Sequence, residues 1–367
     1  MFYKLRLISI NIFVFILFLI SLEIGLRTIR TVRDCIHENC NLSHYKINQQ
    51  TVWFGISKPN SQLGFETKSN LDKIINYKGW ENVKLSTDAY GLRNSGHLDG
   101  KFNQRLKILT VGDSFTFGDQ VSDHETWQYC LNNVQINYLF LNGGVPGYGT
   151  AQSLLRGKIL IKKIEPEYLL ISTLVGHDFA RDQLSYRTGF PMSPVSKKDG
   201  KLFHTKNINP DVIGSKFYKG KYKANILIKI IASSELIRKY FPQLARKEIE
   251  YLQSNLFEKN INSPSKEEII QWTINNSRNL EIPVIWLLQY SATLNNAFLD
   301  ERKNIINQLK FNKIPYIDSF NILHGDDINH SLKNKIWINK NHHSPLGNKL
   351  ICDLIKENIH LIKEVKN

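Results

Sequence analysis

A serine at the end of an apolar run is the first residue of this chain that could do chemistry. Residues 106–111 are apolar and rich in strand-forming types, and Gly112-Asp113-Ser114 follows at once. Such a run predicts a central parallel strand, and ligands bind at the carboxyl ends of strands of this kind. Ser114 is therefore a candidate nucleophile, with its backbone N–H placed to face a developing oxyanion.

Candidate site residues also follow two other predicted strands. Gly144 follows a short apolar strand at 138–141, where a glycine lets the backbone N–H approach a substrate closely. His177 follows the third predicted strand, 168–175, and is the polar residue at that strand end.

A general base must lie within hydrogen-bond reach of the serine hydroxyl. His342 and His343 stand together immediately before the last predicted helix, 345–362. One of these two imidazoles is the predicted base.

The elements that position these residues alternate along the chain between short apolar runs and helical patterns. This alternation predicts the α/β class, as a three-layer α/β/α sandwich with a parallel sheet. Thr150 is expected to cap the first long helix. Strands are predicted at 106–111, 138–141, 168–175, 284–288 and 316–317, and helices from 150, over 266–278, 296–309 and 345–362.

These blocks together resemble the SGNH hydrolases, also called the GDSL-like lipase/esterase family, which have a flavodoxin-like fold. The resemblance implies Ser114 as nucleophile and first oxyanion donor, Gly144 as second donor and His342 as base. It implies small acyl groups as substrates, and no cofactor or metal is expected. The matching segments are 87–121, 142–152, 165–182 and 316–354, of which 87–93 resembles membrane-anchored bacterial members.

Two positions depart from the family pattern. His177 stands where the family has an oxyanion-binding Asn, and its ring is expected to donate in place of the amide. Asn339 stands where the Asp that orients the histidine is expected, and an amide cannot stabilise an imidazolium by charge. Three replacements are open: a carboxylate from another loop, a backbone carbonyl that makes His342 part of a dyad, or a register shift that makes His343 the base. The candidate carboxylates are Asp318, Asp326 and Asp327.

The N-terminus predicts a membrane anchor. Residues 7–22 are almost all apolar and follow Lys4 and Arg6, and about twenty such residues span a bilayer as a helix. No small-residue cleavage site follows, which favours an uncleaved anchor over a signal peptide. We expect the large domain to be periplasmic or extracellular.

Three regions are predicted from these patterns. Residues 1–34 form the anchor and its flank, and residues 35–104 form a small β-containing extension. Residues 105–367 form the SGNH-like domain, interrupted at about 181–262 by an insertion that reads as a lid or partner surface. The insertion is expected to contain a helix at 224–256.

The four cysteines fall into two pairs along the chain. Cys35 and Cys40 lie close together beyond the predicted anchor, where an oxidising compartment would let them pair. With His37 and His44 they also make a possible zinc set, which we rank below a disulfide or two free thiols. Cys130 and Cys352 lie in apolar helical patterns and are predicted to be plain core residues.

The net charge is +15, from 48 Lys and Arg against 33 Asp and Glu. This balance favours anionic partners, such as phosphorylated or uronic glycans and lipid headgroups. No concentrated basic run with interleaved aromatics is present, which disfavours nucleic acid.

The leading hypothesis is a serine-dependent esterase acting on acyl esters, chiefly O-acetyl esters, of envelope glycans. An O-acyltransferase would use the same acyl-enzyme. The rival from another class is a degenerate SGNH-fold protein that binds an envelope polymer without catalysis, and a purely structural envelope protein is the third hypothesis. The oligomeric state is not predicted.

Overall fold

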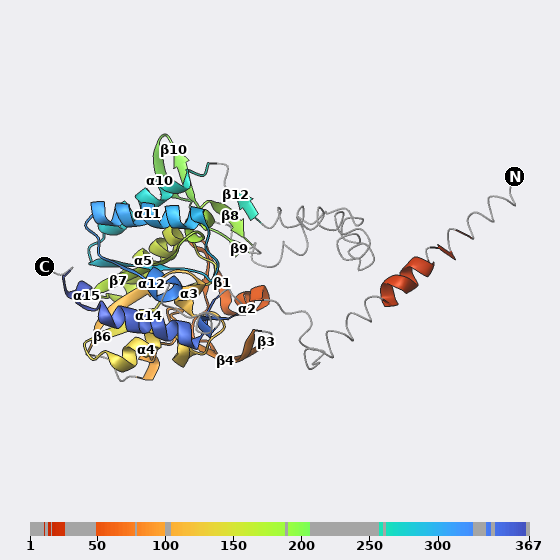
Figure 1. Cartoon of the computed structure of the whole chain (residues 1–367), viewed down its shortest axis with the longest axis horizontal. Coiled ribbons are helices and arrows are strands. Elements are labelled where there is room, and N and C mark those ends of the chain that lie inside the picture. The colour runs from red at the N-terminus through yellow and green to blue at the C-terminus, as the bar shows by residue number, and fades with distance from the viewer. Residues whose placement is uncertain are drawn as a thin grey trace. The chain divides into compact units, whose positions relative to one another are not determined.

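Five parallel strands form the centre of the fold in the computed structural model of the chain (Figure 1). Their order across the sheet is β14-β13-β7-β5-β6. The strands are β5 (Leu106–Val111), β6 (Tyr138–Asn142), β7 (Tyr168–Leu174), β13 (Val284–Gln289) and β14 (Tyr316–Asp318). The structure describes residues 11, 14–15, 17–25, 49–77, 79–99, 104–187, 190–205, 257–259, 262–325, 335–338 and 342–364.

Helices cover both faces of this sheet, which gives the three predicted layers (Figure 1). The helices α5 (Thr150–Ile164), α10 (Lys266–Arg278) and α11 (Asn296–Phe311) lie on one face. The helices α4 (Trp127–Val134) and α14 (Pro345–Glu357) lie on the other. Coverage on both sides explains why every residue of β7 is buried and why its sequence is largely apolar.

Local sequence signals set most helix boundaries. Ser265 and Glu268 form a capping box at the start of α10, which has the predicted bounds. The N-cap of α5 is Gly149, so the prediction that Thr150 caps this helix was wrong; the Thr150 hydroxyl contacts that of Thr173 instead. The last predicted helix is also shorter than expected, because the Asn358 side chain bonds the Leu354 carbonyl and ends α14.

Elements shorter than these carry the site residues. A single turn, α3 (Ser114–Phe117), follows β5, and α6 (Asp178–Arg181) follows β7. The two-residue strands β15 (Trp337–Ile338) and β16 (His342–His343) pair immediately before α14. The remaining short helices are η2 (His97–Asp99), η3 (Asp123–Glu125), α12 (Phe320–His324) and α15 (His360–Glu364).

The N-terminal elements share a second hydrophobic core with the loops at the carboxyl ends of β5 and β6. Trp53, Phe65 and Trp80 from these elements are buried in one cluster with Phe117 of α3 and Tyr148. The elements are α2 (Gln49–Ile56) and the two hairpins β1 (Ser57–Asn60) with β2 (Gly64–Thr67), and β3 (Asp72–Tyr77) with β4 (Trp80–Ser86).

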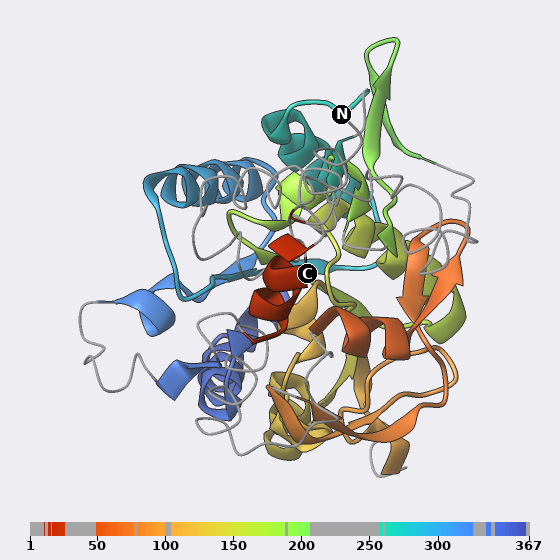
Figure 2. The same ribbon diagram turned by 90° about the vertical axis from the view of Figure 1, so that its right-hand side faces the viewer.

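Residues 47–214 and 258–367 form one compact unit, so the described part of the predicted extension belongs to the same unit as the sheet. The insertion begins with short strands, and β2 lies beside β9 (Figure 2). The helix predicted at 224–256 lies outside the described residues. The strands of the insertion are β8 (Leu184–Arg187), β9 (Phe190–Pro191), β10 (Val195–Lys198), β11 (Lys201–His204) and β12 (Phe257–Lys259).

A disulfide joins Cys130 of α4 to Cys352 of α14, with 6.1 Å between the Cα atoms. The prediction that these two are unpaired core residues was wrong. An apolar helical pattern shows that a cysteine is buried, but only the contact between the two helices shows that the thiols meet. Cys35 and Cys40, and the possible zinc set with His37 and His44, lie outside the described residues.

Residues 17–25 are helical and carry large exposed apolar side chains, including Phe18 and Ile24. In the part of the chain that the structure describes, no helix has both the length and the apolarity needed to cross a bilayer. Much of the predicted span lies outside that part, including residues 7–10, 12, 13 and 16.

Candidate active site

Ser114 lies at the carboxyl end of β5, between the neighbouring strands β6 and β7. The Asp113 carboxylate caps the single turn α3 by accepting a hydrogen bond of 2.9 Å from the Phe115 N–H. Gly112 is required just before this turn, because a Cβ there would lie 2.8 Å from the Ser172 carbonyl oxygen. The strand end and the capped turn together place the serine hydroxyl.

His342 is the hydrogen-bond partner of Ser114. Its Nε2 lies 2.9 Å from the Ser114 Oγ, across 228 residues of sequence. The ring of the adjacent His343 points elsewhere, with its centroid 4.9 Å from those of Phe115 and Trp337. The structure therefore brings His342, and not His343, to the predicted nucleophile.

Gln120 orients the His342 ring from its other side. The Gln120 Oε1 lies 2.9 Å from His342 Nδ1, and the Gln120 Nε2 donates to the Gly79 carbonyl oxygen at 2.9 Å. Because the amide nitrogen is turned to Gly79, its oxygen accepts the Nδ1 proton. This leaves the lone pair of Nε2 directed at the Ser114 hydroxyl.

A carboxylate lies on the serine side of the same imidazole. Asp119 Oδ2 is 3.6 Å from His342 Nε2 and accepts a hydrogen bond of 2.8 Å from Trp53 Nε1. Asp119 and Gln120 follow the nucleophile turn directly, yet sequence reasoning passed over both. The only available signal was their closeness to Ser114, because neither occupies a position of the family pattern.

Arg93 holds the backbone of the loop that carries Asp119 and Gln120. This arginine is fully buried and donates to the Phe117 carbonyl at 2.9 Å, to that of Gly118, and through Nε to the Asp123 carboxylate at 2.9 Å. Gln120 itself has a positive φ of 68°, a conformation that a non-glycine residue adopts only when its surroundings impose it. Through Arg93, the 87–93 segment thus fixes the backbone that carries Asp119 and Gln120.

Burial lowers the pKa of His342 to about 4. The charge of Asp113 raises this pKa, whereas Arg181 and Arg187 lower it. The ring is therefore neutral at neutral pH, which is the state in which Nε2 can accept a proton.

Gly144 does not have the environment of an oxyanion donor. Its N–H donates to the Asn142 Oδ1 at 3.1 Å, and a Cβ at this position would lie 2.4 Å from the Phe117 nitrogen. Gly144 thus serves the packing of the β6 loop beneath α3.

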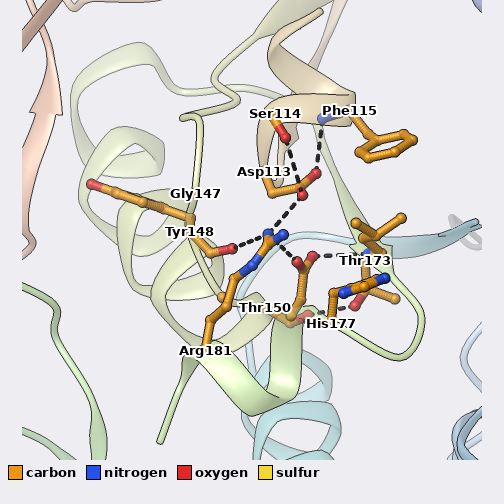
Figure 3. Close-up of polar contacts among 12 residues, drawn as sticks. Asp113, Ser114, Phe115, Gly147, Tyr148, Thr150, Thr173, His177 and Arg181 are labelled. Carbon is orange, nitrogen blue, oxygen red and sulfur yellow. Dashed lines mark hydrogen bonds and ion pairs between the residues drawn. The ribbon is translucent and has the colours of Figure 1, made fainter. Parts of the chain in front are cut away.

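Gly147, three residues further, lies on the same side of the site as Asp113 and Ser114 (Figure 3). It has a positive φ of 87°. Among the residues that the structure describes, neither its N–H nor that of Ser114 has a hydrogen-bond acceptor. These two N–H groups, rather than that of Gly144, are available to an oxyanion.

His177 follows β7, as expected, but its ring is directed toward Ser291, beyond the end of β13, and toward Phe298 of α11. Its Nε2 lies 3.5 Å from the Ser291 Oγ, and its ring centroid is 4.9 Å from that of Phe298. Burial, with a further effect of Arg181, lowers the pKa of His177. The structure shows no contact between the described atoms of His177 and Ser114, and a protonated donor is disfavoured there.

Arg181 connects the loops that meet at the site (Figure 3). Its Nη1 lies 2.8 Å from Asp113 Oδ2 and 2.6 Å from Asp178 Oδ1, and donates to the Tyr148 carbonyl at 3.1 Å. Burial and the charge of Asp113 raise the pKa of Asp178, and Arg181 opposes this rise. Asp178 is therefore a partner of Arg181 and not of His342.

Asp318, another of the proposed acids, has partners other than His342. Asp318 contacts Arg302 at 2.5 Å and accepts the Tyr290 hydroxyl at 2.8 Å. Asp326, Asp327 and Asn339 lie outside the described residues.

Comparison with known proteins gave matches only among solved structures. No protein-family model matches the sequence, and no curated protein matches it. Esterase EstA from Pseudoalteromonas sp. is 13% identical, with coverage of 71% of this chain and 100% of that chain and a TM-score of 0.40. A putative lipolytic protein of the G-D-S-L family from Desulfitobacterium hafniense is 14% identical, covering 69% and 99%, with a TM-score of 0.35. The acetylxylan esterase Axe2 from Geobacillus stearothermophilus is 10% identical, covering 70% and 95%, with a TM-score of 0.37. Likenesses at this level do not establish an activity, and the case for one rests on the contacts of Ser114 and His342.

Proposed function

We propose that this chain is a serine esterase of the SGNH hydrolase type that removes small acyl groups, chiefly acetyl, from envelope glycans. The observation that carries the proposal is the 2.9 Å contact between Ser114 Oγ and His342 Nε2, with Gln120 bonded to the other ring nitrogen. A nucleophile, a neutral base and a group that orients the base are the parts that acyl transfer requires.

The reaction follows from these contacts. The Ser114 oxygen attacks the ester carbonyl carbon while His342 Nε2 takes the hydroxyl proton. The tetrahedral intermediate collapses when the bond to the alcohol breaks, and the imidazolium returns its proton to the leaving oxygen. Water, deprotonated by the same nitrogen, then attacks the acyl-enzyme and releases the acid.

Charge stabilisation comes from both sides of the serine. The N–H groups of Ser114 and Gly147 are assigned to the oxyanion. Two groups stabilise the imidazolium of His342. Gln120 accepts the hydrogen bond of its Nδ1 proton, and the carboxylate of Asp119 lies 3.6 Å from its Nε2. An amide orients the ring but contributes no charge, so the activation of Ser114 is weaker than with an Asp bonded at Nδ1.

The same acyl-enzyme could pass its acyl group to a sugar hydroxyl instead of water, which would make the chain an O-acyltransferase. Adding acceptor glycan to the assay distinguishes the two, because transfer lowers the yield of free acid for each bond broken. Equal yields with and without acceptor assign the chain to hydrolysis.

We further propose that an N-terminal anchor places the enzyme outside the cytoplasm. Two observations support this location. Large apolar side chains of the N-terminal helix are exposed, among them Phe15, Phe18 and Ile24, and such a surface needs a covering. The Cys130–Cys352 disulfide is typical of an oxidising compartment. Membrane-extracted protein whose mature chain begins after residue 23 would contradict the anchor.

The test of the esterase uses the full chain, solubilised in detergent if it purifies with membranes. Wild type is expected to react with a fluorophosphonate probe and to cleave an activated acetyl ester, and Ser114→Ala and His342→Ala are expected to do neither. Labelling and turnover that are alike in all three proteins would leave a binding protein without catalysis.

A further inference from the structure

We propose that Arg187 forms an anion-binding subsite beside Ser114, so that the natural substrate carries a carboxylate or phosphate close to the acyl ester. This inference rests on the proposed esterase function and names the substrate class of the same site.

Arg187 lies close enough to the site for its charge to act on His342. It ends β8, and its Nη1 donates to the Gly147 carbonyl oxygen at 3.0 Å. Gly147 is also the residue whose N–H is available to the oxyanion. The guanidinium is therefore bonded to the same residue whose N–H we assign to the oxyanion.

Arg187 forms no ion pair with a carboxylate of the described residues. Within the described ranges, no carboxylate lies at ion-pair distance from this guanidinium. Asp113 and Asp178 are the acids that act on it electrostatically, and both contact Arg181 instead. A second cation so near the first is costly unless an anion joins them.

Arg187 nevertheless keeps its charge at neutral pH. Burial, followed by the neighbouring charge of Arg181, lowers its pKa to about 9. A guanidinium has five N–H donors in a planar fork, and the Gly147 carbonyl is its one acceptor in the described part of the chain. The remaining donors match the two oxygens of a carboxylate or phosphate.

The side chains around Arg187 are apolar. They include Trp53, Phe190 and Met192, and the space between them is too small to hold a water molecule, so an anion must reach the guanidinium from the side of the serine. None of these side chains is charged, so the guanidinium alone would recognise the anion.

A different role for Arg187 predicts a different result. If the guanidinium stabilised the oxyanion itself, its loss would slow the cleavage of every ester by the same factor. An anion subsite instead changes the preference between charged and neutral substrates, so the ratio of the two kcat/KM values separates these roles.

The experiment measures kcat/KM of the full chain on three O-acetylated substrates: galacturonate oligosaccharides, a hexose phosphate and neutral xylo-oligosaccharides. Wild type is expected to prefer one of the two anionic substrates, which also decides between carboxylate and phosphate. In Arg187→Met the ratio of anionic to neutral kcat/KM is expected to fall about tenfold or more. Arg187→Lys, which keeps the charge but not the fork, is expected to fall between the two.

The matched control is Lys162→Met, which removes an exposed positive charge from the last turn of α5. This control should leave the ratio unchanged, because it alters net charge and not the subsite. A wild type with no anionic preference, or an equal loss on all three substrates in Arg187→Met, overturns the subsite.

A separate readout distinguishes failure of the subsite from failure of the esterase. Titration calorimetry on Ser114→Ala with non-acetylated galacturonate oligosaccharides and with hexose phosphate needs no turnover. At least one is expected to bind, and the added Arg187→Met change should abolish that binding. If wild type does not react with fluorophosphonate, the esterase proposal fails while this titration still decides the subsite.

Discussion

The two sides of Ser114 differ in whether their hydrogen-bonding groups are already satisfied. On the base side, His342, Gln120 and Gly79 bond one another in sequence at 2.9 Å per contact. On the substrate side, the N–H groups of Ser114 and Gly147 have no acceptor among the described residues. The base side must hold one geometry, and protein groups satisfy its hydrogen bonds. The substrate side must receive a ligand, and its N–H donors are open to that ligand.

Removing the reacting pair should have the largest effect. Ser114→Ala or His342→Ala is expected to lower kcat/KM for an activated acetyl ester at least about a thousandfold, because nucleophile and base act as a unit. Steady-state kinetics on each variant and on the double variant check this. A double variant far slower than either single one would show that the two residues do not share one step.

A smaller loss of kcat is expected when Gln120, which orients the ring of His342, is replaced. Gln120→Leu keeps the volume but leaves Nδ1 without its acceptor, and a hydrogen bond to a group that becomes charged contributes about 1.5–3 kcal/mol. The expected fall in kcat is therefore about tenfold to a hundredfold.

Gln120→Glu provides the sharper companion measurement. A carboxylate at Nδ1 favours the imidazolium, so the acid limb of the kcat/KM profile should move to higher pH. A Gln120→Leu variant with unchanged kcat would show that the amide does not orient the base.

The pH profile of wild type tests the burial of the base. A neutral Nε2 is required, and the lowered pKa of about 4 means that kcat/KM should stay high from neutral pH down to about pH 5. It should fall about tenfold for each further unit below about pH 4. A limb near pH 6.5 would indicate an imidazole as exposed as in a free peptide.

The lowered pKa of His342 also makes the stability of the fold depend on pH, with less stability at acidic pH. The unfolded chain binds protons as the pH falls below about 6.5, while folded His342 stays neutral until about pH 4. His343, whose pKa burial lowers to about 3, adds an effect of the same sign. Stability should therefore decline over this window on acidification, as urea unfolding at several pH values would show.

The smallest effect on turnover is expected far from both sides of the serine. Cys130→Ser with Cys352→Ser should leave kcat/KM of the folded enzyme nearly unchanged, because the disulfide joins α4 to α14 at their own contact. It should lower the free energy of unfolding by about 2–5 kcal/mol, measured by urea titration. A large loss of turnover at full folding would show that the α4–α14 contact sets the position of His342.

The sheet was predictable because it depends on local pattern. Buried parallel strands are continuous apolar runs, so β5, β7 and β13 were found close to their true bounds. The helix α10 was also predicted with its true bounds, and a capping box at Ser265 and Glu268 begins it in the structure.

The site was predictable only where a residue follows directly from a strand or helix end. Ser114 and His342 meet this condition and lie together. Gly144 meets it too, but its loop folds back beneath α3, so Gly147 presents the available N–H instead. Gln120 and Arg187 belong to no motif, and no spacing indicates that their side chains contact His342 and Gly147.

The sequence by itself thus determined which strands form the central sheet, that they lie parallel, and that a serine and a histidine stand where such elements end or begin. Only the tertiary structure decided which neighbours those two residues have: Gln120 in place of an acid, Gly147 in place of Gly144, and Cys130 bonded to Cys352. The reason is physical. Strand formation depends on side chains adjacent along the chain, whereas these contacts depend on loops and helices that meet only when the sheet has been packed on both faces.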